Sequence, residues 1–154
     1  MKSRRTWREK MDNPNLPKVV DAPPNWMKNQ SRNGSMLIPS PHQVDSMIRS
    51  VRKGRLITVT QIREALSQKH MTDLTCPLCT GIFVRIAAEA AAEDARAGKT
   101  RITPYWRVVK DDGSLNPKFP GGITAQAERL RDEGHHILPG RGKRPPRVAE
   151  MVLR

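Results

Sequence analysis

The sequence predicts a mainly α-helical domain with a short β segment, lying between two flexible basic arms. Three observations predict this fold class. The segments 40–51 and 58–66 each begin with a capping-box pattern and continue with apolar residues at helical spacing. The segment 80–98 is rich in alanine, the residue with the highest helix propensity. The β-branched pair at 108–109, followed by a turn, is typical of a short strand.

The first predicted helix starts at a clear N-terminal signal. Ser40 is the expected N-cap, Pro41 stands at the first helical position, and Gln43 completes the capping box. The spacing i, i+3, i+4, i+7 predicts one buried face made of Val44, Met47, Ile48 and Val51. Gly54 is the expected stop of this helix.

A pair of helices is predicted next. Thr58 and Gln61 form the second capping-box pattern, ahead of an apolar face made of Ile62, Ala65 and Leu66. A loop runs to Pro77, and the alanine-rich helix then ends at Gly98. This order fits a helix-turn-helix whose second helix enters a DNA groove, although the loop is longer than the usual tight turn.

The remaining part of the domain is predicted as a strand, a turn and a last helix. The turn lies at 111–113, where Asp-Asp-Gly is typical turn chemistry, and a second strand is expected to start after it. A rigid-then-flexible loop, "FPGG", precedes a helix with Ile123, Ala127 and Leu130 inward and Gly134 as its stop.

Charge and composition point to a polyanionic partner. The chain has 154 residues and a net charge of +13, with 28 Lys and Arg against 15 Asp and Glu. We expect a basic, proline-rich and mostly unpacked arm over 1–36, anchored by Trp7 and Trp26, a DNA-binding domain over 37–138, and a basic tail over 139–154. The basic residues concentrate in the flanks, as expected if these contact phosphate.

The same composition excludes several other classes of protein. No apolar run is long enough for a membrane helix, and no apolar segment follows the basic N-terminus as in a signal peptide. Two cysteines do not make a disulfide framework. We therefore expect a monomer without membrane contact, in a reducing cytoplasm and, in a bacterium, near the nucleoid.

Cys76-Pro-Leu-Cys79 is the most conspicuous local motif. A zinc site needs four ligands, and neither a second cysteine pair nor a histidine at ligand spacing is present. A redox pair is a second interpretation, because a helix N-terminus lowers a thiol pKa, but the surroundings do not resemble a βαβ unit. We interpret both cysteines as packing residues at the start of the long helix, and we expect no metal and no cofactor.

The stretch "TPYWRVV" places two of the six aromatic residues side by side. Tyr105 and Trp106 stand between Pro104 and Arg107, and the loop from Phe119 to Gly122 follows about a dozen residues on. Aromatic rings beside a strand often have no other role than to cover the hydrophobic core. Together with a glycine loop they can also form a pocket for a flipped base, which stacks on aromatic rings.

In the order and spacing of three motifs the chain resembles the alkylguanine-DNA alkyltransferase family. The family has Pro-Cys-His-Arg-Val-Val, a Tyr-Ser-Gly-Gly loop, and a helix ending in Glu-Gly. This chain has Pro104-Tyr105-Trp106-Arg107-Val108-Val109, then Phe119-Pro120-Gly121-Gly122, then Glu133-Gly134-His135. The resemblance covers about residues 37–138. It implies a winged-helix-like helix-turn-helix domain of the alkyltransferase C-terminal type.

The departures from the family determine the function that the resemblance implies. The acceptor cysteine falls on Tyr105 and the assisting histidine on Trp106. A phenol without an adjacent base is a poor alkyl acceptor, so we assign no catalytic residue. The chain is most similar to the alkyltransferase-like branch of the family, which carries Trp where Tyr105 stands. Those proteins bind and flip alkylated guanine without repairing it and pass the lesion to other repair proteins.

The resemblance and the distribution of basic residues together assign the binding residues. The base pocket is expected to consist of Pro104, Tyr105, Trp106, Arg107, Phe119, Pro120, Gly121 and Gly122, with Arg107 bracing the loop. The DNA contact is expected to consist of Arg85, Thr58, Thr60, Gln61, Lys53 and Arg55. Within this set Arg85 fills the gap left by the flipped base, and Lys53 and Arg55 hold phosphates. The family's phosphate-pushing tyrosine falls on Val59.

Two other functions fit the sequence. The chain can be an active alkyltransferase that uses Cys76 or Cys79 as acceptor, since a helix N-terminus can activate a thiol. It can also be a plain helix-turn-helix regulator without lesion recognition. The expected partner in all three cases is double-stranded DNA.

Overall fold

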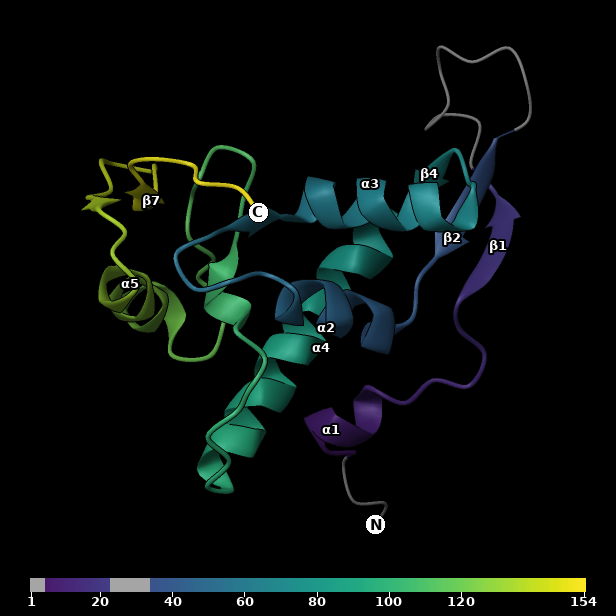
Figure 1. Cartoon of the computed structure of the whole chain (residues 1–154), viewed down its shortest axis with the longest axis horizontal. Helices are drawn as coiled ribbons and strands as arrows, with labels where there is room; N and C mark the ends of the chain where they lie inside the picture. The colour runs from purple at the N-terminus through teal and green to yellow at the C-terminus, as the bar shows by residue number, and fades with distance from the viewer. Residues whose placement is uncertain (1–4, 23–33) are drawn as a thin grey trace.

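The computed structural model describes residues 5–22 and 34–154 (Figure 1). Its α-helices there are α1 (Trp7–Lys10), α2 (Pro41–Arg49), α3 (Val59–His70), α4 (Pro77–Arg96) and α5 (Gly122–Asp132), with a 3-10 helix η2 (Tyr105–Arg107). The strands are β1 (Lys18–Asp21), β2 (Ser35–Ile38), β3 (Ile57–Thr58), β4 (Leu74–Thr75), β5 (Val108–Val109), β6 (Ile137–Leu138) and β7 (Arg147–Val148). The fold is mixed α/β. The helices match the predicted class, but the strands form three small sheets where one short segment was expected.

Both predicted capping boxes are present. The hydroxyl groups of Ser40 and Thr58 accept from the backbone N–H groups of Gln43 and Gln61, whose side chains accept from the N-cap N–H groups in return. The predicted stop of the first helix is wrong, because α2 ends at Arg49 with Ser50 as its C-cap. Gly54, at a φ of +85°, instead forms the turn that leads into β3.

The predicted helix pair consists of α3 and α4. Met71 ends α3 in the left-handed conformation, and β4 occupies part of the connection. Helix α4 starts at Pro77 with Cys76 as its N-cap, three residues before the predicted start, and Gly98 follows its end at a φ of +86°. Figure 1 shows α3 lying across the upper end of α4, which runs away from it at a steep angle.

The predicted strand–turn–strand is only partly correct. The turn exists, because the N–H of Gly113 donates to the carbonyl oxygen of Lys110 at 2.8 Å. The strand before it does not form a hairpin. Strand β5 pairs in parallel with β3, so that Val108 faces Ile57 and Val109 faces Thr58. This pairing joins η2 directly to the residues that begin α3.

The expectation of an unpacked N-terminal arm is wrong for residues 5–22. The backbone N–H groups of Trp7 and Arg8 donate to the carboxylate of Glu93 on α4, at 2.8 and 3.0 Å. Met11 is fully buried in the core. Strand β1 then pairs antiparallel with β2. Trp7 anchors the arm as predicted, whereas Trp26 lies outside the described residues.

The basic tail also packs against the domain. Strand β7 pairs with β6, and Val148 is buried in the core. The backbone N–H of Leu56 donates to Val152, and that of Arg154 donates to Leu56, at 2.8 and 2.9 Å. The chain therefore ends beside β3, as Figure 1 shows. A free, flexible tail does not describe residues 147–154.

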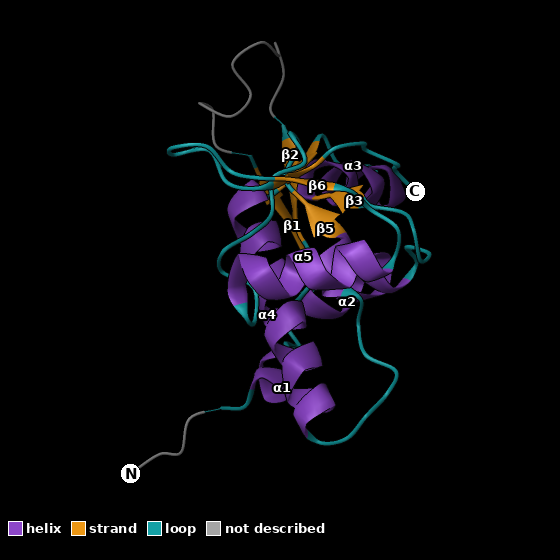
Figure 2. Cartoon of the chain, turned by 90° about the vertical axis from the view of Figure 1, so that its left-hand side faces the viewer, coloured by secondary structure: helices purple, strands orange, loops and turns teal. Residues whose placement is uncertain are grey.

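The core lies where α2 and the alanine-rich face of α4 meet. Alanines 87, 88, 90 and 91 are buried there, so the backbone of α4 approaches its neighbours closely. Helix α5 lies across the body at a large angle to α4 and contacts η2 (Figure 2). Among the described residues, no helix has the length and apolar character needed to cross a membrane.

Candidate nucleic-acid interface

The aromatic corner is a single turn of 3-10 helix with a fixed entry. The hydroxyl of the fully buried Thr103 donates to Asp45 on α2 at 2.6 Å. The backbone N–H of Arg107 closes the turn on the carbonyl oxygen of Pro104 at 3.1 Å. These bonds hold Tyr105 and Trp106 between α4 and α5, where η2 contacts both helices.

The aromatic rings of the corner pack against one another. Tyr105 meets Trp106 and Phe119 edge-on, with ring centroids 5.4 and 5.5 Å apart. The exposed fractions of the three side chains are only 6, 7 and 3%. The structure therefore brings the predicted pocket residues together, but as part of the core, with no open aromatic wall in this conformation. Burial raises the pKa of Tyr105, so the phenol stays protonated at neutral pH.

The carboxylate of Glu133 holds the aromatic corner through hydrogen bonds to two of its residues. This carboxylate accepts from the Trp106 indole N–H at 2.9 Å and from Arg107 Nε and Nη2 at 2.9 and 2.8 Å. Arg107 Nη1 also donates to the carbonyl oxygen of Val51 at 2.7 Å. The side-chain bonds of Arg107 therefore go to Glu133 and Val51, and not to the loop 119–122 that it was expected to brace, and its guanidinium is already engaged.

Two opposing effects set the pKa of Glu133. Burial alone raises it, but the hydrogen bonds from Arg107 and Trp106 and the charge of Arg107 outweigh burial. The net effect lowers the pKa below its ordinary value, so Glu133 remains ionised.

Gln126 is a site residue that the sequence interpretation missed. It is fully buried on α5, and its amide donates to the carbonyl oxygens of Trp106 and Val108 at 3.1 and 2.9 Å. Its own oxygen accepts from the backbone N–H of Asn116 at 2.8 Å. One feature of the sequence could have revealed it: this glutamine lies beside Ala127, on the predicted inward face of the helix.

The glycine loop requires its glycines. Gly121 has a φ of +76° and forms the N-cap of α5. A Cβ atom there would lie 2.5 Å from the Cβ of Ala125, which is closer than carbon atoms can approach. A larger residue would force the loop, including Phe119, which contacts Tyr105, away from α5.

The predicted DNA-contact residues differ in whether their side chains are exposed or already engaged within the protein. Thr58 and Gln61 cap one another, and the hydroxyl of Thr60 donates to Asp111 at 2.8 Å. Lys53 and Arg55 are exposed, in the turn before β3. Arg85 is exposed on α4, with its guanidinium 5.8 Å from the ring centre of Trp7. Arg85 therefore lies beside the N-terminal segment.

The two cysteines form the start of α4. The sulfur of Cys76 accepts from the backbone N–H of Cys79 at 3.3 Å. Burial, together with the neighbouring Cys76, raises the pKa of Cys79 to about 11. The thiol of Cys79 is therefore protonated at neutral pH, which does not support the alternative in which the helix N-terminus activates it. Residues 5–22 and 34–154 contain no cluster of metal-ligating side chains.

We predict that Cys76→Ser with Cys79→Ser leaves DNA binding unchanged within about twofold, because a serine hydroxyl at 76 can still cap α4. Binding to duplex DNA and the thermal midpoint of unfolding test this. A large loss of DNA affinity in a folded double variant would contradict the packing role.

Comparisons with models of protein families, with curated proteins and with solved structures gave no match.

Proposed function

We propose that the protein binds double-stranded DNA and recognises alkylated guanine in it without accepting the alkyl group. The observation that carries this proposal is the parallel pair β3–β5. It joins the Tyr105–Trp106 corner to the start of α3, with Val109 facing Thr58. In this proposal the corner recognises the base, α3 and α4 form the helix-turn-helix, and the strand pair joins the two parts directly. The net charge of +13 supports a polyanionic partner.

The helix-turn-helix in this proposal is of the winged-helix-like, alkyltransferase C-terminal type. Helix α4 is its recognition helix, and Lys53 and Arg55 hold phosphates. Arg85 is exposed on α4, where it can fill the gap left by a flipped base once it moves away from Trp7.

The absence of alkyl transfer follows from the chemistry at the acceptor position. The pKa of Tyr105 is raised by burial, and Trp106 uses its only N–H to bind Glu133. An indole offers no basic nitrogen that could remove the phenolic proton. Cys79, with a pKa of about 11, is no better nucleophile, which argues against Cys79 as the alternative acceptor.

Base recognition also requires a local movement. Because Tyr105 and Phe119 are in contact, the loop 119–122 has to move away from η2 before a base can stack on Tyr105. The positive φ angles of Gly121 and Gly122 show that this loop uses backbone conformations that glycine adopts at low cost.

The test is binding to a duplex containing O6-methylguanine and to its unmethylated twin, followed by intact-mass measurement. We expect tighter binding to the lesion and no mass gain. Equal binding would indicate a plain DNA-binding regulator, and a mass gain of one methyl group would indicate an enzyme.

Tyr105→Leu should lower the affinity for lesion DNA by about ten- to a hundredfold, since base–aromatic stacking contributes about 1–3 kcal/mol. Affinity for undamaged duplex, which depends on phosphates, should hardly change. Tyr105→Phe is the matched control and should keep the preference for the lesion. If leucine and phenylalanine at 105 give the same lesion-to-undamaged ratio, Tyr105 belongs to the core only.

A further inference from the structure

A basic hollow opens beside the aromatic corner, between the end of α2, the end of α4, the segment 99–104 and α5. Its volume is about 480 Å³. Its lining includes six large side chains, those of Arg49, Lys99, Arg101, Arg107, Arg129 and Trp106. Five of these six are cations, and the complete lining contains no carboxylate. The segment around 99–101 and Arg129 are not among the residues that the sequence assigned to DNA.

Only part of the positive charge in this hollow is neutralised by neighbours. Arg107 is paired with Glu133, and Arg49 with Asp45, both at 2.8 Å. Lys99 lies 3.5 Å from Asp94, which also pairs with Arg8. Among residues 5–22 and 34–154, Arg101 and Arg129 have no ion pair with a carboxylate. The hollow therefore presents at least two uncompensated guanidinium groups.

The hollow offers charge but no free surface for stacking a base. The guanidinium of Arg129 lies 4.4 Å from the ring centre of Trp106, and Tyr105 packs edge-on against the same indole. The indole N–H is already bonded to Glu133. A site of this kind suits a phosphate group, which arginine binds through two parallel N–H···O bonds.

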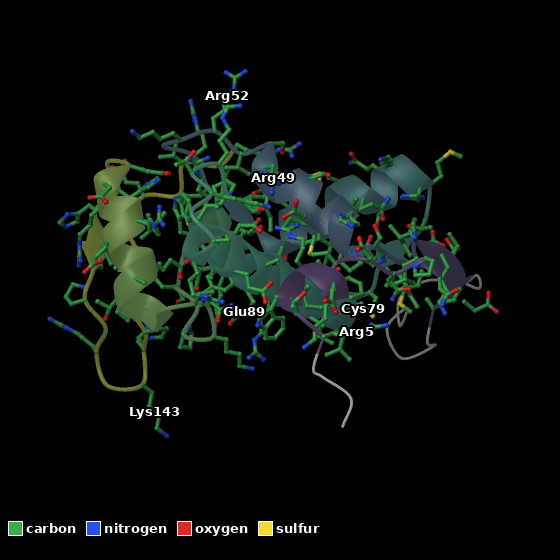
Figure 3. The ribbon with its side chains drawn as sticks, turned by 90° about the horizontal axis from the view of Figure 1, so that it is seen from below. Arg5, Arg49, Arg52, Cys79, Glu89 and Lys143 are labelled. Carbon is green, nitrogen blue, oxygen red and sulfur yellow. The ribbon has the colours of Figure 1, made fainter. Side chains whose placement is uncertain are left out.

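A second basic hollow lies at the C-cap of α2. It has a volume of about 620 Å³ and is lined by Ser50, Arg52, Arg55, Leu153 and Arg154. The guanidinium of Arg154 donates to the hydroxyl of Ser50 at 3.1 Å. Arg49 lines the first hollow, and the next residue along the chain, Ser50, lines the second. Figure 3 shows Arg49 and Arg52 on one side of the molecule, with Lys143 far from both.

We propose that this surface binds the sugar-phosphate backbone of DNA, with one phosphate held in the first hollow by Arg101 and Arg129. The proposal rests on the proposed function for its choice of DNA as the polyanion. It adds a backbone contact beside the corner, formed by residues outside the helix-turn-helix. Such a contact fixes the position of the strand and does not read sequence.

The test compares two double variants that remove the same charge. One is Arg101→Gln with Arg129→Gln. The matched control is Lys110→Gln with Arg131→Gln, two exposed residues that line neither hollow and lie outside the predicted basic flanks. Affinity for an undamaged duplex is measured over a range of salt concentrations. Losing one phosphate contact should flatten the slope of log affinity against log salt by about 0.9, and lower affinity about tenfold at about 0.05 M salt. The control should change both quantities less.

Because Arg129 covers Trp106, a lysine variant checks for structural damage. Arg129→Lys keeps the charge and should keep most of the salt slope. Equal slopes for the two glutamine doubles would show that net charge, and not the hollow, sets affinity. An unchanged slope in the Arg101/Arg129 double would also overturn the proposal, and is the result expected if the surface binds an acidic protein.

The same variants are tested with the O6-methylguanine duplex, so that the two proposals fail separately. Loss of the lesion preference in the parent protein, with a flattened slope in the Arg101/Arg129 double, would refute lesion recognition and leave the phosphate site in place. No binding to any duplex would refute both proposals.

Discussion

Glu133→Gln should lower the free energy of unfolding by about 3–5 kcal/mol, the usual cost of removing one partner from a buried ion pair. The side chains of Arg107 and Glu133 are only 14 and 7% exposed, so water can replace the lost carboxylate only in part. The neutral amide keeps the size of the side chain but leaves the charge of Arg107 uncompensated. It also weakens the bond to the Trp106 indole. Chemical denaturation at neutral pH measures the effect.

The effect of Glu133 should depend on pH in a defined direction. Its pKa is lowered in the folded protein, so the folded state binds its proton less readily than the unfolded state does. Its contribution is therefore complete above the ordinary pKa of 4.5 and is lost as pH falls through the lower folded value. The difference in stability between the parent and Glu133→Gln should shrink over that acid range.

Glu128→Gln is the matched control, because Glu128 is exposed on the same helix, α5. It should change stability by less than about 0.5 kcal/mol. A loss for Glu133→Gln no greater than this would show that the contacts of Arg107 and Trp106 do not stabilise the corner.

Met11→Ala should destabilise the protein by about 2–5 kcal/mol, the usual range for a large apolar side chain truncated inside a core. Met11 is fully buried and belongs to the same core cluster as α2 and α4. The loss includes the transfer of the side chain from water and the cavity that alanine leaves. Removal of residues 1–35 as a whole would therefore remove part of the core as well as basic charge.

Met71→Ala is the control for the same change of residue type. Met71 is 91% exposed at the end of α3, so its truncation should change stability by less than about 0.5 kcal/mol. Similar thermal midpoints for the two variants would mean that residues 5–22 do not contribute to the core.

Only part of the candidate site could be predicted from the sequence. The spacing of the motifs singled out the aromatic corner and the glycine loop, and the structure places Tyr105 and Phe119 in contact. Glu133 was named as part of a motif but not as a residue that holds the corner, and Gln126 was not predicted at all. Gln126 and Glu133 lie 20 and 27 residues from Trp106 along the chain. A glutamine or a glutamate on a helix has the same sequence appearance whether it faces solvent or a buried carbonyl group.

The arrangement of the basic residues in space could not be predicted from the sequence either. Counting residues showed that the chain is basic and that the excess lies in its flanks. It did not show that Arg49, Arg101 and Arg129, from three separate segments, line one hollow. That convergence depends on how the segment 99–104 returns along α4 toward α5, which no local pattern encodes.

By itself, the sequence determined the helix starts at Ser40 and Thr58 and the helix ends at Gly98 and Gly134, because a cap involves groups only a few residues apart. Only the tertiary structure decided that the N-terminal segment joins the core and that β5 pairs with β3. The N–H of Trp7 meets Glu93 across 86 residues of chain, and the partners of β3 and β5 are about 50 residues apart. The local sequence of a polar segment with prolines predicts that it is unpacked. It becomes ordered because α4 offers a carboxylate to its amide groups and the core accommodates Met11.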